Sequence, residues 1–212
     1  MALTPDDCAH RAWLVEQLHA AGAEVRVDAV GNIFGLFTWD DAAPYILCGS
    51  HLDSQKNGGV YDGAYGVVAA LCAARAVDEA VRAGQLAPKA NLAVVDWTNE
   101  EGARFEPSLM GSRVFTGALR LSDVEQAQDL DGVRFGDALR KGGWQGADEP
   151  PRESPRSPQV TSIIPAKTAL SVGRRFIIAL NVITKTQTVP IAHALDTAQS
   201  DISLPAGGLF FL

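Results

Sequence analysis

Two short segments of this sequence carry side chains whose types and spacing suit metal-dependent chemistry. The first segment sets His51 and Asp53 close to Asp62 around a glycine-rich bend, and the second holds the adjacent pair Glu100 and Glu101. An imidazole together with carboxylates is a ligand set that zinc accepts, with manganese and cobalt as alternatives. A bound ion of this kind lowers the pKa of water, and a nearby carboxylate can take up the released proton. The pattern therefore predicts a metal-dependent hydrolase that needs no covalent nucleophile.

The adjacency of the two glutamates divides their predicted roles. Successive side chains of an extended backbone point to opposite sides, so we expect one of Glu100 and Glu101 to bind metal and its neighbour to act as a general base. Asp53 follows His51 by two residues and would share its side of an extended segment. We therefore expect Asp53 to orient the imidazole from outside the ligand shell.

The predicted secondary structure explains how these segments would meet. A short apolar run at 45–48 and a second one at 91–97 are typical of buried strands, and each ends just before one of the two segments. The apolar stretch 64–83 between them predicts a helix, with Asp62 at its entrance. A strand, helix and strand in this order favour a right-handed parallel crossover, which brings both strand ends to one edge of a sheet.

The remaining patterns complete an α/β fold. Residues 4–7 have a capping hydroxyl, a proline and two acids, which predict the start of a helix that Gly22 ends. Alternating patterns predict strands at 24–28 and 33–37, and a short helix is expected from 122–125. Together these elements predict a mixed, mostly parallel sheet flanked by helices.

Three motifs of this sequence closely resemble those of a known family, the di-zinc amidohydrolases that include N-carbamoyl-L-amino-acid hydrolase, allantoate amidohydrolase and β-ureidopropionase. The motifs are Gly-Ser-His-Leu-Asp-Ser at 49–54, Asn-Gly-Gly-Val-Tyr-Asp-Gly at 57–63 and Trp-Thr-Asn-Glu-Glu-Gly-Ala-Arg-Phe at 97–105. The similarity extends upstream to Val-Asp-Ala-Val-Gly-Asn at 27–32 and downstream through 109–117. It covers roughly residues 4–146.

The resemblance implies a zinc-peptidase-like catalytic domain and a role for each candidate residue. In such a domain His51 binds one zinc ion, Asp62 bridges two zinc ions, and Glu101 binds the other. Glu100 would be the general base, and Asp53 would support His51. Enzymes of this family cleave the amide or ureido bond of small N-substituted amino acids, and they are usually homodimers with a separate dimerisation lid.

These implications give three functional hypotheses. The first is a hydrolase of N-carbamoyl amino acids or related ureido compounds, and the second is a hydrolase of N-acyl amino acids or dipeptides. The third is an inactive, truncated fragment. The sequence does not identify residues that bind the substrate, which we expect to be a small molecule.

The resemblance stops near residue 149, where the character of the sequence also changes. Family members continue into a His-Ile-Glu-Gln-Gly segment with a further zinc ligand, then into the lid and a last zinc histidine, and this sequence shows none of these. Residues 152–212 carry 3 acidic and 6 basic side chains, against 22 and 12 in the residues before them. We therefore expect a partial catalytic domain over 1–149 and a divergent tail over 150–212. Translation out of frame is one hypothesis for the tail, and a lineage-specific extension is the alternative.

The short ligand set also bears on metal occupancy. If Asp62 bridges two ions, then His51, Asp62 and Glu101 give at most two protein ligands to each ion, fewer than the three typical of a catalytic zinc site. The sequence therefore predicts weak binding, or binding of a single ion.

The composition narrows the function classes further. A net charge of −7 with a pI of about 5.0 argues against nucleic-acid binding, which calls for concentrated lysine and arginine. The longest apolar stretch, 64–81, is interrupted by Arg75 and Asp78, so we expect no membrane span. The start of the chain lacks the pattern of a signal peptide, and the three cysteines have no C-x-x-C spacing. These features predict a cytoplasmic protein with reduced, mostly buried thiols.

Overall fold

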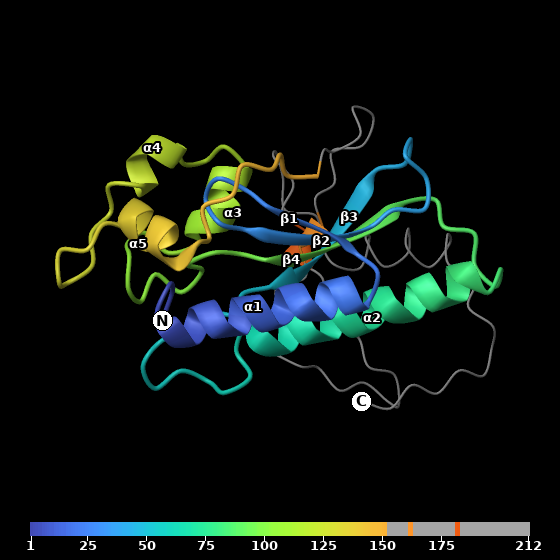
Figure 1. The fold of residues 1–212 in the computed structure, drawn as a ribbon, viewed down its shortest axis with the longest axis horizontal. Helices are drawn as coiled ribbons and strands as arrows, with labels where there is room; N and C mark the ends of the chain where they lie inside the picture. The colour runs from blue at the N-terminus through green and yellow to red at the C-terminus, as the bar shows by residue number, and fades with distance from the viewer. Residues whose placement is uncertain (152–160, 163–180, 183–212) are drawn as a thin grey trace.

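A four-stranded sheet forms the centre of the computed structural model, which describes residues 1–151, 161–162 and 181–182 (Figure 1). The order of its strands is β1-β2-β4-β3. These strands are β1 (Glu24–Val27), β2 (Ile33–Phe37), β3 (Tyr45–Ser50) and β4 (Asn91–Asp96). A separate antiparallel pair is formed by β5 (Thr161–Ser162) and β6 (Asn181–Val182).

The sheet is mixed, as predicted, but it is not mostly parallel. Among the four strands only β3 and β4 run parallel, whereas β2 is antiparallel to both β1 and β4. A parallel pair of consecutive strands needs a long crossover connection. The turn that joins β1 to β2 is too short for one, so these two strands must run antiparallel. The crossover between β3 and β4 contains the helix α2 (Ala64–Arg82). The parallel pair is the one that carries the candidate residues.

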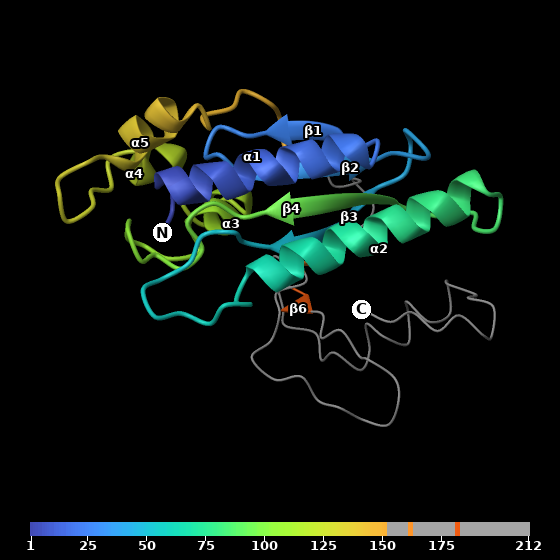
Figure 2. The same ribbon diagram turned by 60° about the horizontal axis from the view of Figure 1, so that its bottom comes forward.

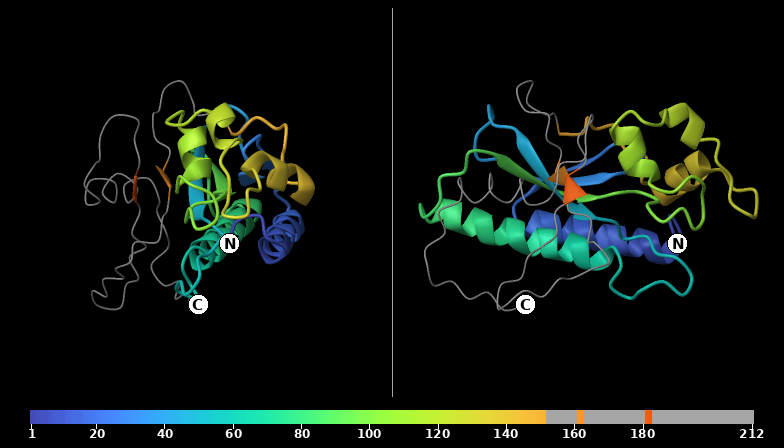
Figure 3. Two further views of the ribbon diagram at one scale, coloured as in Figure 1. Left: turned by 90° about the vertical axis from the view of Figure 1, so that its left-hand side faces the viewer. Right: turned by 180° about the vertical axis from the view of Figure 1, so that it is seen from behind.

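Two long helices cover one face of the sheet and lie side by side (Figures 1 and 2). Helix α1 (Pro5–Ala20) begins where predicted, and the side-chain oxygen of Thr4 accepts a hydrogen bond from the backbone amide of Asp7 at 3.4 Å. Viewed from the end of the sheet, both helices lie on the same side of it (Figure 3). The shared core draws on both helices and on the strands, with Leu14, Leu18, Val67, Leu71, Ile33, Phe37 and Val94 buried together.

Three short helices lie beyond one end of the sheet: α3 (Met110–Phe115), α4 (Leu121–Val124) and α5 (Phe135–Gly142). Helix α4 agrees with the predicted short helix, but α3 and α5 were not predicted. Neither has a side-chain cap at its start, and α3 has only 6 residues, so the sequence signals for a helix are weak. Phe115 of α3 packs against Trp97, with ring centroids 5.2 Å apart, and thereby covers part of the second face of the sheet.

The parallel pair brings the two candidate segments to one edge of the sheet. Ser50 is the register partner of Asp96, and each is the last residue of its strand. The backbone amide of Trp97 then donates to the carbonyl oxygen of Ser50 at 2.8 Å. The segments that follow β3 and β4 therefore leave the sheet side by side, as the sequence predicted.

Other predictions concern the thiols, the membrane and the end of the chain. All three cysteines are free, but only Cys48 is buried, whereas Cys8 and Cys72 are half-buried. In the described residues, no helix combines the length and the apolarity needed to cross a membrane. The predicted tail over 150–212 lies almost wholly outside the described residues, so its boundary and the out-of-frame hypothesis stay predictions.

Close packing of α1 on β2 predicts a stability effect at Gly35. A Cβ atom at Gly35 would lie 2.2 Å from Cδ2 of Leu18, so this glycine lets the helix approach the strand. We expect Gly35→Ala to lower the free energy of unfolding by about 1–3 kcal/mol through overpacking, measured by urea denaturation. In a Leu18→Ala background the same change should cost much less. An equal cost in both backgrounds would contradict this explanation.

Candidate metal centre

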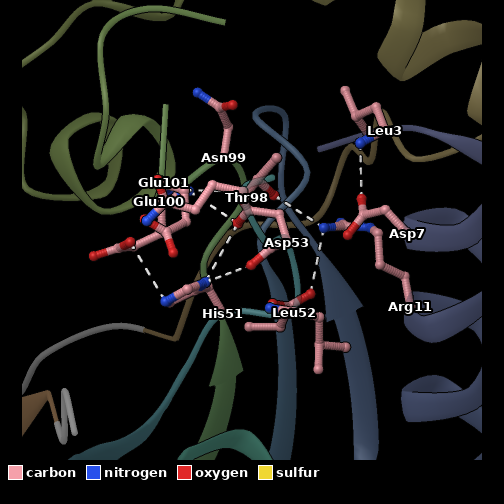
Figure 4. Close-up of polar contacts among 12 residues, drawn as sticks. Leu3, Asp7, Arg11, His51, Leu52, Asp53, Thr98, Asn99, Glu100 and Glu101 are labelled. Atoms are coloured by element: carbon pink, nitrogen blue, oxygen red, sulfur yellow. Dashed lines mark hydrogen bonds and ion pairs between the residues drawn. The ribbon is translucent and has the colours of Figure 1, made fainter. Parts of the chain in front are cut away.

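His51, Glu100 and Glu101 come together where β3 and β4 end (Figure 4). One ligand atom from each of the three side chains lies within 4.8 Å of the others. Within the described part of the chain, this is the one group of three or more histidine, cysteine or acidic side chains close enough to hold a metal ion. The structure therefore joins both sequence segments in a single site.

The hydrogen bonds of His51 leave one ring nitrogen free for a metal ion. Its Nδ1 lies 2.8 Å from the backbone carbonyl oxygen of Asp53, and because that oxygen can only accept, Nδ1 carries the proton. In the neutral ring Nε2 then presents its lone pair, and it lies 3.4 Å from Oε2 of Glu100. Metal-binding histidines commonly donate their other ring N–H in this way, which fixes the tautomer and the ring orientation.

Asp53 supports the site through both its main chain and its side chain. Its carbonyl oxygen orients His51, as described above, whereas its carboxylate accepts hydrogen bonds from the backbone amides of Glu100 at 3.0 Å and Glu101 at 3.3 Å. The prediction that Asp53 orients the imidazole referred to the carboxylate, which lies 3.7 Å from Nδ1. The side chain of Asp53 thus has a second role that the sequence analysis missed, because it holds the glutamate segment in place.

The two glutamates point to the same region, which corrects the expectation from an extended backbone. Residues 98–99 form a turn that continues into a bend at 100–101, and Asn99 has a left-handed φ of 53°. This bend removes the alternation of side chains, so Glu100 and Glu101 both reach the group around His51. The side-chain amide of Gln55 donates to Oε2 of Glu101 at 3.1 Å and so links it to the segment that follows β3.

Asp62 lies near this group but outside it. It precedes Gly63, the N-cap residue of α2, and it is half-buried. Gly63 lies against the imidazole, because a Cβ atom there would be 2.5 Å from Nδ1 of His51, and its φ of 74° also favours glycine. The backbone beside Asp62 therefore contacts His51. The role of Asp62 as a bridging ligand stays a prediction.

Burial and like charges shift the acid–base behaviour of the site. Burial raises the pKa of Glu100, and the neighbouring carboxylates of Glu101, Asp53 and Asp62 raise it further. For His51, burial alone lowers the pKa, but the carboxylates of Glu100 and Asp53 outweigh it and the net shift is upward. The excess of negative charge favours binding of a cation, and binding then becomes weaker at low pH as protons compete for the same atoms.

A buried ion pair connects this site to α1. Oδ1 of Asp96 accepts a hydrogen bond from the backbone amide of Leu52 at 2.8 Å, and its Oδ2 lies 3.3 Å from the guanidinium of Arg11. Arg11 also donates to Oγ1 of Thr98 at 3.4 Å (Figure 4). It donates to the carbonyl oxygen of Gly31 as well. The first helix thus holds the segments that carry His51 and the glutamates.

The sequence contained a signal for this ion pair that the sequence analysis missed. The buried residues of α1 are Asp7, Arg11, Leu14 and Leu18, and their spacing places all of them on one helix face. Two charged residues within an apolar helix face indicate buried charge that must find partners. That signal predicts an internal ion pair, although it does not identify Asp96 as the partner.

Two buried carboxyl groups that do not belong to the group of His51, Glu100 and Glu101 allow a prediction of how the stability of the fold depends on pH. Burial raises the pKa of Asp96 from 3.8 to about 7, and it also raises the pKa of Asp28. From about pH 4 to 7 the folded chain holds protons that the unfolded chain has released, so the free energy of unfolding should fall as pH rises. Urea denaturation in the presence of a chelator, at steps between about pH 5 and 8, measures this decline. Stability that increases over this range would contradict the assignment.

Comparison with known proteins agrees with this geometry. The model of the family described as Peptidase family M28 matches residues 32–149. A hydrolase from Mycolicibacterium smegmatis is 51% identical over 136 residues, which cover 64% of this chain and 31% of that protein. The N-carbamoyl-L-amino-acid amidohydrolase of Rhizobium meliloti is 38% identical over 149 residues, which cover 69% of this chain and 35% of that protein.

A solved structure extends the comparison to the fold. The hydantoinase/carbamoylase family amidase from Burkholderia ambifaria superposes with a TM-score of 0.66 at 44% identity, over 71% of this chain and 36% of that one. The chain thus spans about a third of the length of these relatives, with shares of 31%, 35% and 36%. These findings confirm the resemblance to carbamoylase-type amidohydrolases. Because the family match covers more than half of the chain, the protein belongs to Peptidase family M28.

Proposed function

We propose that this chain binds a divalent metal ion and serves the hydrolysis of a carbon–nitrogen bond in N-carbamoyl amino acids or related ureido compounds. The observation that carries the proposal is the convergence of His51, Glu100 and Glu101 within 4.8 Å at the end of the parallel strands. The names of the relatives support the substrate class, because they include an N-carbamoyl-L-amino-acid amidohydrolase and a hydantoinase/carbamoylase amidase. The substrate would be a small molecule.

The donor atoms fit a metal ion of the zinc, manganese or cobalt type. An imidazole nitrogen and carboxylate oxygens form a set that these ions accept. We therefore expect one ion per chain, with His51 and Glu101 as its ligands and the carboxylate of Glu100 beside it. The two-ion centre that the family resemblance implies would draw on Asp62, which lies outside this group.

Within the proposed mechanism, Glu100 acts as the general base and Glu101 and His51 as ligands. A bound divalent ion would polarise the substrate carbonyl and lower the pKa of water. Burial and neighbouring carboxylates raise the pKa of Glu100 toward the range in which a carboxylate can both accept and return a proton. Glu100 would accept a proton from the attacking water and return it to the leaving nitrogen. The carboxylate of Asp53 holds the backbone of Glu100 during both steps.

A second candidate function is hydrolysis of an N-acyl amino acid or a dipeptide. The family description favours this alternative, because it names a peptidase family. The same metal-facing residues would serve it, since the bond to be broken is again an amide. The two functions differ in the substrate and not in the chemistry of the described site.

Incubation of the purified chain with zinc, manganese or cobalt and three substrate classes tests these proposals. N-carbamoyl amino acids, N-acetyl amino acids and dipeptides are compared, with a chelator as the control. Chelator-sensitive turnover of N-carbamoyl amino acids above the other two supports the first proposal, and a preference for the others supports the second. Metal binding without turnover of any of them would show that this chain alone is not a hydrolase, in agreement with the inactive-fragment hypothesis.

A further inference from the structure

Asn32 has a fully buried side chain that contacts the backbone just before the two glutamates. It lies in the turn between β1 and β2, and its exposed fraction is 0%. Its Oδ1 accepts a hydrogen bond from the backbone amide of Thr98 at 3.0 Å, and its Nδ2 donates to the carbonyl oxygen of Gly111 at 3.1 Å. A single amide therefore joins the first hairpin, the end of β4 and the start of α3.

Asp28 fixes the orientation of this amide. Its Oδ2 accepts a hydrogen bond from Nδ2 of Asn32 at 2.9 Å, and its Oδ1 accepts from the backbone amides of Val30 at 3.1 Å and Asn32 at 2.8 Å. The backbone amide of Thr98 can only donate and the carbonyl oxygen of Gly111 can only accept, so Oδ1 must face Thr98 and Nδ2 must face Gly111 and Asp28. The direction of the contact with Thr98 is thereby set.

The start of α3 holds the same segment from another side. The backbone amides of Leu109, Met110 and Gly111 donate to the carbonyl oxygens of Glu100 at 2.7 Å, Asn99 at 3.2 Å and Thr98 at 2.9 Å. Gly111 is required for this approach, because a Cβ atom there would lie 2.1 Å from Oδ1 of Asn32. The carbonyl oxygens of Thr98, Asn99 and Glu100 are therefore all bonded to the start of α3.

We propose that Asn32, oriented by Asp28, is a positioning residue that holds Glu100 and Glu101 where both carboxylates face the proposed metal site. The side chain of Asp53 accepts hydrogen bonds from the backbone amides of both glutamates. The side chain of Asn32 accepts one from the backbone amide of Thr98, two residues before Glu100. The bend at Asn99, which brings the two carboxylates to the same region, lies between these two points of attachment. The inference rests on the proposed metal site, although Asn32 does not belong to the metal-facing group.

A second buried asparagine provides a matched control. Asn91 is 1% exposed, its Oδ1 accepts from the backbone amides of Trp39 at 2.8 Å and Asp40 at 3.1 Å, and its Nδ2 donates to the carbonyl oxygens of Asp40 at 2.8 Å and Ala43 at 3.0 Å. It is the first residue of β4, whereas the glutamates follow the last. Loss of Asn91 therefore removes comparable hydrogen bonds at the end of the strand remote from the site.

The test compares Asn32→Ala with Asn91→Ala in the full chain. Zinc affinity is measured by calorimetry at a temperature where both variants are folded, and amide exchange at Glu100 and Glu101 is measured without metal. We expect Asn32→Ala to raise the zinc Kd by about 10–100-fold, as loss of an outer-shell partner does, and to speed exchange at both glutamates. Asn91→Ala should lower stability to a similar degree and leave both quantities within about threefold of the original chain.

The two readouts separate failure of this inference from failure of the metal site. If the original chain binds no zinc, the proposed function fails, and the exchange rates still decide whether Asn32 positions the glutamates. Equal effects of the two substitutions on affinity or on exchange would overturn the positioning role and leave Asn32 as a structural residue only. If Asn32→Ala does not fold, Asn32→Ser replaces it, because serine keeps a hydroxyl that can bond to Asp28, whereas its shorter side chain gives up the contact with Thr98. The same outcomes then apply.

Discussion

Replacing Arg11 by methionine is expected to lower the free energy of unfolding by about 3–5 kcal/mol, because it leaves the carboxylate of Asp96 buried without its cation. The two side chains are 2% and 1% exposed, and they lie 3.3 Å apart. The cost should be larger at pH 8 than at pH 6, because protonation of Asp96 at the lower pH removes the unpaired charge. Urea denaturation at both pH values measures the effect.

Two further variants separate the ion pair from other consequences of the substitution. The double variant Arg11→Met and Asp96→Asn should recover much of the lost stability, since asparagine can still accept from the backbone amide of Leu52 and carries no charge. Arg75 lies exposed on α2, and Arg75→Met should change stability by no more than about 0.5 kcal/mol. A double variant as unstable as Arg11→Met alone would show that buried charge is not the cause.

Replacing His51 by alanine is expected to weaken zinc binding by more than about 100-fold. The loss should exceed the roughly 10–100-fold cost of removing a partner outside the ligand shell, because Nε2 of His51 is itself a proposed ligand. Calorimetric titration of the purified chain with zinc measures the change. The chain offers a matched control in His10, an exposed histidine on α1.

His10→Ala should leave zinc affinity unchanged, and its unfolding curve should match that of the original chain. His51→Ala, in contrast, should lose affinity while it stays folded at the temperature of the titration. Undiminished zinc binding by His51→Ala would place the ion elsewhere and contradict the role of this residue.

The sequence predicted the elements that have strong local signals. Helix α1 has Thr4 as its cap and Pro5 in its first turn, and α2 is a long apolar stretch, so their positions followed from propensity and capping. The strand at 33–37 was predicted with the bounds that β2 has. The parallel crossover then placed the two candidate segments together, which needed no knowledge of distant contacts.

The sequence could not give the parts of the site that depend on contacts between distant segments. The turn at Asn99 is held by the start of α3 and by Asn32, and neither contact leaves a signal in the residues 97–101 themselves. For this reason the two glutamates were expected on opposite sides. The role of the Asp53 side chain was missed for the same reason, because its partners lie 47 and 48 residues away along the chain.

Anomalous diffraction at the zinc edge, from crystals of this chain grown with zinc, tests the central claim most directly. We predict one peak per chain at the end of β3 and β4, bonded to Nε2 of His51 and to a carboxylate oxygen of Glu101, with the carboxylate of Glu100 beside it. Nδ1 of His51 should keep its hydrogen bond to the carbonyl oxygen of Asp53. A peak bonded to Nδ1, a peak that does not contact His51, or no peak in crystals soaked to saturation would contradict the claim.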